Sequence, residues 1–335
     1  MSPIPLRRLA LCCLASLALY AGLFGFVLGR PLSHGLLTEM IDIRLARAAA
    51  IDGPKLVILA GSNGLYSHRC ETIEPILKLP CVNGGIAVGI GLDYLFTRWG
   101  GVLHAGDVVY LPMEQAQYVR GRATSALGPD AAILFRHDWP TLAQLAPRRW
   151  IAAMFAFDFR AGVMSVVETA LLLTHAYDPH LAQAGTANAY TNAWGDHIGH
   201  TAALAEEYRA TLAAAHGYSA SAAEIAAGDG TAEIARFVAH ASARGIRVVG
   251  GLPTGFADVP PSEATVEAIQ SVYTGHGGQF LALANRSRYP RTDFFDSPDH
   301  LNEMTQQEHS RSVAVALSGL LGGKAQIQAL AIAPR

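Results

Sequence analysis

Charge is scarce in this sequence. Only 16% of its 335 residues are Asp, Glu, Lys or Arg, and the 25 basic residues do not outnumber the 27 acidic ones. A protein that binds a nucleic-acid backbone needs a basic excess to neutralise phosphates, so we exclude a dedicated nucleic-acid binder. Hydrophobic residues make up 51% of the chain, which excludes disorder as its main state.

Cysteine is also rare. Four cysteines are too few for a disulfide scaffold in a chain of this length. Cys12 and Cys13 fall in an apolar N-terminal run and are interpreted as small apolar fillers. Cys70 and Cys81 lie beyond that run, so in an exported chain they either form a disulfide or stay as buried free thiols.

No charged residue lies between Arg8 and Arg30. About 20 apolar residues at about 1.5 Å each span the hydrocarbon core of a bilayer. The run is longer than the apolar region of a cleaved signal peptide, and residues 27–31 lack a small-residue cleavage site. With Arg7 and Arg8 before it, residues 1–30 are predicted to be a single-pass signal anchor in the inner (cytoplasmic) membrane, with the rest of the chain in the periplasm or outside.

A second apolar stretch, residues 150–176, is interrupted by Asp158, Arg160 and Glu168. Each such charge at a bilayer centre costs about 2.5–3.5 kcal/mol. We therefore interpret this stretch as a helical insertion, partly buried or membrane-apposed, and not as a second span.

The exported part alternates short apolar strands with helices. Residues 31–54 are predicted to be a juxtamembrane helix and linker, and a domain follows over residues 55–325. Strands are expected at 56–60, 80–83, 107–111, 246–250 and 279–284, with a last helix over 303–321. This alternation predicts an α/β fold with a parallel sheet covered by helices on both faces. Residues 115–227 break the rhythm and are interpreted as a helical insertion.

Three segments carry residues suited to chemistry. Ser62 follows the first strand, where a free helix N-terminus favours the anion formed when a serine attacks a carbonyl. Gly84 and Gly85 follow the second strand and let the backbone approach a bound group. His300 lies before the last helix, between carboxylates that can orient an imidazole base.

These segments, in this order, resemble the SGNH (GDSL-like) hydrolase superfamily over about residues 55–111 and 230–320. That family has a flavodoxin-like parallel sheet, with its Ser after the first strand, a Gly after the second and its His near the C-terminus. The resemblance implies that Ser62 is the nucleophile and His300 the base. It also implies that the N–H groups of Ser62, Gly85 or Gly84 bind the oxyanion.

Two departures from the family pattern matter. The family places an Asp three residues before the His, where this chain has Ser297. We favour Asp296 as the substitute, because its Phe-Phe lead-in can bury it and adjacent side chains seldom pair well; Asp299 is the alternative. The third family block, a Gly-x-Asn-Asp after the third strand, is replaced by a segment that ends in Glu114 and has no Asn donor.

With these departures the sequence resembles the membrane-anchored branch that acylates cell-surface polymers. This branch includes alginate and cellulose acetylation proteins and the teichoic acid D-alanylation protein. The resemblance implies a polysaccharide acceptor, often a multi-pass membrane acyltransferase as partner, and no cofactor. Glu114 is kept as a candidate substrate-binding residue.

A further polar cluster runs from Asn192 to His197. Trp194 can stack on a sugar face, and Asn192 and Asp196 can bind its hydroxyl groups; a satisfied structural turn is the alternative. His197 and His200 lack the Glu of the H-E-x-x-H motif, so no metal site is predicted.

The main hypothesis is an extracytoplasmic serine enzyme that carries an acyl group, most simply acetyl, on Ser62 and passes it to a polysaccharide hydroxyl or to water. The sequence does not separate transferase from esterase. The alternative is a non-catalytic assembly factor that binds polysaccharide or a membrane acyltransferase. A flavodoxin-like nucleotide binder is disfavoured by the missing phosphate-loop Lys and the incomplete glycine pattern.

Overall fold

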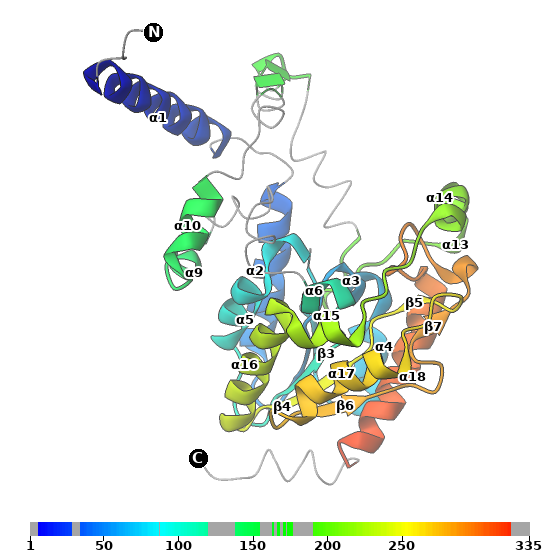
Figure 1. Ribbon diagram of the computed structural model, residues 1–335. Helices are drawn as coiled ribbons and strands as arrows, with labels where there is room; N and C mark the ends of the chain where they lie inside the picture. The colour runs from blue at the N-terminus through cyan, green and yellow to red at the C-terminus, as the bar shows by residue number, and fades with distance from the viewer. Residues whose placement is uncertain are drawn as a thin grey trace.

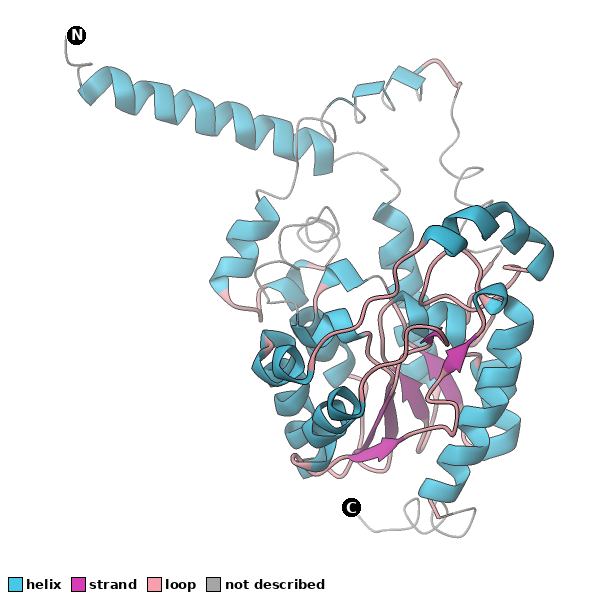
Figure 2. Cartoon of the chain, turned by 45° about the vertical axis from the view of Figure 1, so that its right-hand side comes forward, coloured by secondary structure: helices cyan, strands magenta, loops and turns pink. Residues whose placement is uncertain are grey.

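The computed structural model describes residues 6–28, 34–86, 88–119, 138–154, 163, 166–167, 170–171, 173–176 and 190–322. Within them, one parallel sheet has the strand order β2-β1-β3-β4-β6, and the strands are magenta in Figure 2. The strands are β1 Leu56–Ile58, β2 Cys81–Asn83, β3 Val108–Leu111, β4 Arg247–Gly251 and β6 Gln279–Leu281. Each coincides with a predicted strand, so the predicted α/β fold with a parallel sheet is confirmed. A small pair, β5 Gly255–Phe256 and β7 Arg288–Tyr289, lies outside the main sheet.

Helices surround the sheet (Figure 1). Before β4 they are α1 Leu6–Leu28, α2 His34–Ala50, α3 Ser62–Ser67, α4 Cys70–Leu77, α5 Leu92–Gly100, α6 Gln115–Val119, α9 Trp139–Leu142, α10 Pro147–Met154, α13 Ala202–Ala205, α14 Arg209–Ala214, α15 Ala222–Ala227 and α16 Asp229–Ala243. After β4 they are α17 Glu263–Thr274 and α18 Glu303–Leu320. The described part of the predicted insertion is largely helical, as expected.

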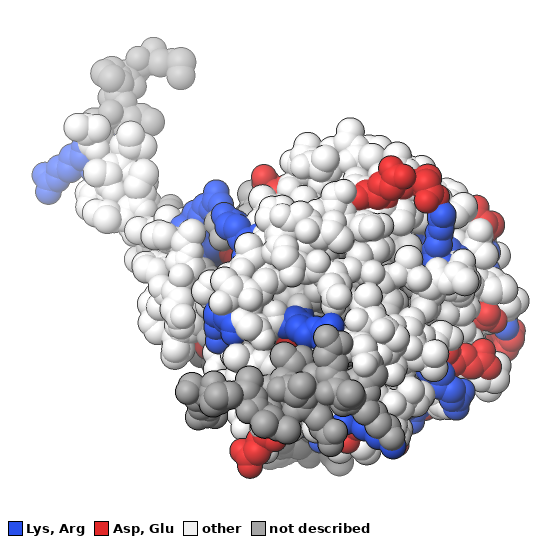
Figure 3. Space-filling model, turned by 90° about the horizontal axis from the view of Figure 1, so that it is seen from below, with Lys and Arg blue, Asp and Glu red and all other residues white. Residues whose placement is uncertain are grey.

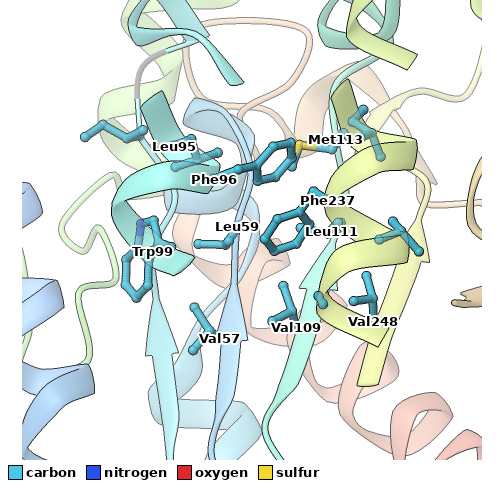
Figure 4. Packing of buried hydrophobic residues seen from close by; sticks show 14 of the residues in the cluster. Val57, Leu59, Leu95, Phe96, Trp99, Val109, Leu111, Met113, Phe237 and Val248 are labelled. Carbon is cyan, nitrogen blue, oxygen red and sulfur yellow. The ribbon is translucent and has the colours of Figure 1, made fainter. Parts of the chain in front are cut away.

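Alternate residues of the short strands enter two separate cores, because successive side chains of a strand point to opposite faces. Val57, Val109 and Val248 pack with α5 and α16 on one face, as Figure 4 shows. Leu56 and Val108 pack with α4 and α18 on the other face. Both faces are therefore covered, as the unbroken apolar strands predict.

Helix α2 lies within residues 31–54, which the sequence predicts to be a juxtamembrane helix and linker, and it packs into the domain core. Ile41, Leu45 and Ala48 are buried in the core shared with α5 and α16. Arg44 between them is 1% exposed and donates to the backbone carbonyl of Gly195, from Nε at 3.1 Å and Nη2 at 2.8 Å. Seven residues after α2 begins, at Ile41, the chain thus already contributes to the core that supports the sheet.

Helix α1 is long and apolar enough to cross a membrane. The candidate span Leu6–Leu23 has a mean hydropathy of 1.5 and buries nothing inside the protein, and α1 projects away from the sheet in Figure 1. A membrane anchor and a signal sequence both have these properties.

Within the second apolar stretch, the described side chains of Ile151, Val163 and Val167 are exposed. The partly buried interpretation therefore does not hold for these side chains. The interrupting charges Asp158, Arg160 and Glu168 lie outside the described residues.

A disulfide bears on the compartment of the protein, and the distribution of surface charge bears on its partners. Cys70 and Cys81 form a disulfide that joins the start of α4 to the start of β2, which decides the alternative left open by the sequence. The surface in Figure 3 carries acidic and basic side chains scattered among uncharged ones, in keeping with the formal net charge of −2.

Candidate active site

Ser62 is the first residue of α3 and follows β1 after a short turn. It is half-buried at the carboxyl edge of the sheet. Gly61 before it has no room for a side chain, because a Cβ there would collide with the carboxylate of Glu114 and with Val88. The close approach of these neighbours explains why glycine precedes the serine.

Ser62, His300 and Asp296 form one hydrogen-bonded chain. His300 Nε2 lies 2.8 Å from Ser62 Oγ, and His300 Nδ1 lies 2.6 Å from Asp296 Oδ1. With the proton on Nδ1, the ring donates to the carboxylate, and Nε2 accepts from the serine hydroxyl. A hydroxyl, an imidazole and a carboxylate in this order are able to move a proton off the serine as its oxygen attacks a carbonyl.

A tight loop places Asp296 beside His300. Phe294 and Leu301 pair as an isolated bridge, and both side chains are fully buried. Within the loop the Phe295 N–H donates to the His300 carbonyl at 2.8 Å. The chain therefore folds back on itself, and a carboxylate four residues before the histidine reaches its ring.

The favoured choice of carboxylate, Asp296, agrees with this geometry, and the alternative, Asp299, does not. The backbone carbonyl of Asp299 accepts from Ser67 Oγ and Thr254 Oγ1, each at 2.9 Å. Burial raises the pKa of the Asp299 carboxyl, and the positive charges of His300 and Arg288 oppose that rise. Among the described contacts, the His300 ring pairs with Asp296 and not with its sequence neighbour.

The two candidate oxyanion glycines are already hydrogen-bonded. The Gly84 N–H donates to the Ile58 carbonyl at 2.8 Å, and the Gly85 N–H donates to Asn83 Oδ1 at 3.1 Å. A Cβ at Gly85 would press on the backbone of Gly64 in α3. The glycine pair therefore lets α3 pack closely on the β2 loop, and the predicted oxyanion role of Gly84 and Gly85 is not seen in this arrangement.

Glu114 lies beside Ser62, in contact with the backbone of its neighbour Asn63. Its Oε1 accepts from the Asn63 N–H at 3.2 Å, and the residue is 9% exposed. The segment after β3 thus brings a carboxylate to the backbone of the residue that follows Ser62. A carboxylate here opposes a second negative charge on a substrate oxygen.

The predicted sugar-binding cluster is a structural turn. Asp196 is fully buried, and its carboxylate accepts four hydrogen bonds, from the N–H groups of Cys70 and Glu71 and from the side-chain amides of Asn83 and Asn192. Burial raises the pKa of Asp196, and those donors oppose the rise. With each contact made inside the chain, Asp196 and Asn192 are not placed to bind a sugar.

Trp194 belongs to the same turn. Its Nε1–H donates to Glu74 Oε2 at 2.8 Å, its backbone carbonyl accepts from the Asn83 N–H at 2.9 Å, and Arg47 lies 5.3 Å from its ring centroid. These contacts tie Trp194 into the turn, and its stacking on a sugar stays a prediction. The sequence does not separate the two interpretations, because a turn whose polar groups are all hydrogen-bonded and a sugar-binding site use the same residue types.

His197 and His200 lie close to the triad. Burial, together with the charge of His300, lowers the pKa of His197 to about 4 and that of His200 to about 3, so both rings are neutral at pH 7. In the described part of the chain, no group of three or more His, Cys, Asp or Glu side chains is arranged to hold a metal ion.

Tyr66 is the site residue that the sequence analysis missed. Its ring is stacked on the His300 ring, with centroids 4.1 Å apart and planes 14° apart. Burial and the charge of Asp296 raise the pKa of Tyr66 to about 12. The signal that identifies it is helical spacing, since Tyr66 follows Ser62 by one turn of α3 and so shares its face.

Comparison with known proteins does not identify the chain: no family model, no curated protein and no solved structure matches it. The function is therefore inferred from the geometry of the site.

Proposed function

We propose that this protein is a serine-dependent acyl-transferring enzyme of the membrane-anchored branch resembling the SGNH superfamily. The single observation that carries the proposal is the hydrogen-bonded chain from Ser62 through His300 to Asp296. The strand order gives further support, because β2-β1-β3-β4-β6 corresponds to the flavodoxin-like order 2-1-3-4-5.

The proposed reaction has two half-steps. Ser62 Oγ attacks the carbonyl carbon of an acyl ester while its proton passes to His300 Nε2, and that proton then leaves with the departing alcohol. The acyl group, most simply acetyl, remains as an ester on Ser62. An acceptor hydroxyl next gives its proton to His300 and attacks the ester carbonyl, and Ser62 recovers the proton when the acyl group leaves.

The acceptor is proposed to be a hydroxyl of a cell-surface polysaccharide, with water as the acceptor in an esterase. A multi-pass membrane acyltransferase is the proposed acyl supplier. Helix α1 would hold the domain on the outer face of the inner membrane, and the Cys70–Cys81 disulfide supports an oxidising compartment.

One observation favours a second function, a non-catalytic assembly factor. The Glu114 carboxylate lies at the Asn63 N–H, and the Gly84 and Gly85 N–H groups are already engaged. Such a site disfavours an oxyanion unless Glu114 is displaced or protonated. The same fold would then bind polysaccharide or a membrane acyltransferase without chemistry.

Labelling of the full-length, detergent-solubilised chain with a serine-directed fluorophosphonate separates the two functions. The enzyme proposal predicts one labelled serine in the wild type and no labelling of Ser62→Ala. Ser271→Ala removes a hydroxyl from the exposed face of α17 and keeps full labelling as the matched control. A folded wild type that resists the reagent supports the assembly factor.

A further inference from the structure

The ring of Tyr66 lies between two imidazoles. It is stacked on His300, and the ring of His197 lies on it with centroids 4.3 Å apart and planes 45° apart. Phe295, from the loop that carries Asp296, is parallel to Tyr66 within 15° at 6.1 Å. Tyr66 is thus enclosed by rings from the predicted insertion and from the His300 loop.

Helix α3, which carries Tyr66, is fixed to its surroundings. The Asn83 side-chain amide donates to the Gly64 carbonyl at 2.8 Å, and the Gln306 amide donates to the Leu65 carbonyl at 2.9 Å. Both donors are buried. Because Ser62 and Tyr66 share this short, anchored helix, a ring stacked on Tyr66 keeps a fixed position relative to the Ser62 hydroxyl.

His300 and its carboxylate partner are both partly exposed: the His300 side chain is 14% exposed and that of Asp296 is 31% exposed. The hydrogen bonds at Nδ1 and Nε2 hold the ring at its edge, and the torsion about its bond to Cβ has broad minima. Contact over the ring face stops this rotation, and an aromatic face also attracts the imidazolium formed when the proton arrives.

We propose that Tyr66 is a positioning residue, whose ring fixes the plane of the His300 imidazole so that Nε2 stays aimed at Ser62 Oγ. This inference rests on the proposed function of Ser62. The proposed action belongs to the ring and not to the hydroxyl, because the face stacked on His300 is the π surface of Tyr66.

Two variants of Tyr66 separate the ring from the hydroxyl. Tyr66→Phe keeps the stacked face, and Tyr66→Leu removes it. Tyr208→Leu is the matched control, because Tyr208 packs edge-on against Phe295 with centroids 5.2 Å apart and is 37% exposed. The full-length chain of each variant is compared by fluorophosphonate labelling rate and by thermal unfolding midpoint.

The proposal predicts that Tyr66→Phe and Tyr208→Leu label within about threefold of the wild type. Tyr66→Leu should label on the order of 10- to 100-fold more slowly with an unchanged unfolding midpoint, because a small misplacement of a catalytic group costs about that much. Equal rates for Tyr66→Leu and Tyr208→Leu would overturn the proposal, and so would equal slowing of Tyr66→Phe and Tyr66→Leu.

A spectroscopic readout keeps this test separate from the proposed function. The proton shared by His300 Nδ1 and Asp296 gives a far-downfield proton resonance, which His300→Ala assigns by its loss. Persistence in Tyr66→Phe with loss in Tyr66→Leu supports the positioning role even if the wild type is never labelled, in which case only the enzymatic function fails. Persistence in both variants overturns the positioning role.

Discussion

Two segments of this chain contain the same dipeptide, Asp-His, but their side chains have different hydrogen-bond partners. Asp196 and His197 lie in the turn after Trp194, whereas Asp299 and His300 lie in the loop before α18. In neither segment does the histidine hydrogen-bond its neighbouring Asp. His300 instead reaches back four residues to Asp296, and the residue four before His197 is an alanine.

The two segments differ in where their polar atoms find partners. The Asp196 carboxylate is fully buried and accepts four hydrogen bonds from the chain itself. Asp296 is partly exposed and holds an imidazole whose other nitrogen faces a half-exposed hydroxyl. A cluster whose polar atoms are all paired inside the chain supports the fold, and a cluster that ends at a serine hydroxyl is the one from which the proposed chemistry would start.

The largest effect that sharpens this comparison comes from the two aspartates near His300. Asp296→Ala removes the partner of Nδ1, and we expect labelling of Ser62 to slow on the order of 10²- to 10⁴-fold. Asp299→Ala should slow it less than about fivefold. The fluorophosphonate labelling rate measures both, and the reverse order would show that the carboxylate has been assigned wrongly.

The corresponding change in the structural turn acts on stability. Asp196→Ala removes the acceptor of four hydrogen bonds, two of them buried, so we expect the free energy of unfolding to fall by about 3 kcal/mol. Asp258→Ala, which breaks the exposed pair with Arg291, should cost less than about 1 kcal/mol. Chemical denaturation measures the difference, and equal costs would contradict the structural role of the turn.

Lowering the pH tests a third group of polar side chains, the buried pair His68 and His309. Burial lowers the pKa of His68 to about 4, and burial together with His68 lowers that of His309 well below 6.5. Both therefore bind protons more readily in the unfolded state. Stability is complete above about pH 6.5 and is lost as the pH falls toward the folded values.

The measurement is the thermal midpoint of the full chain between about pH 7.5 and about pH 5. We expect the midpoint of the wild type to fall with acid, and that of His309→Gln to fall less steeply. His240→Gln, at an exposed position, should keep the slope of the wild type. A slope unchanged in His309→Gln would exclude this pair as its source.

The smallest expected effect is at Trp194. Trp194→Phe loses the hydrogen bond to Glu74 Oε2 but keeps an aromatic ring, so stability should fall by about 1 kcal/mol. Its labelling rate and the ester content of the surface polymer should match the wild type. A lower ester content of the polymer with an unchanged labelling rate would indicate that Trp194 binds the acceptor.

The sequence predicts the fold well because its signals are local. Unbroken apolar runs such as 107–111 lie between helix patterns, and the parallel sheet follows from that alternation. It also predicts Ser62 and His300 from their places after the first strand and before the last helix, and it favours Asp296 for its Phe-Phe lead-in; the structure brings these three side chains together.

What the sequence could not predict depends on long-range contacts. The role of Asp196 depends on N–H groups more than a hundred residues away, at Cys70 and Glu71. The engagement of Gly85 depends on the rotamer of Asn83. Tyr66 could have been found, because helical spacing places it on the face of Ser62, but the ring it would meet comes from the far end of the chain.

The central claim is that the hydroxyl of Ser62 becomes acylated, and an activated acetyl ester tests it most directly. After brief exposure of the full-length chain and acid quenching, peptide mass spectrometry should find one acetyl group on the peptide that contains Ser62. The same peptide from Ser62→Ala and from His300→Ala should carry none. Acetylation that ignores both substitutions, or none in a folded wild type, would contradict the account.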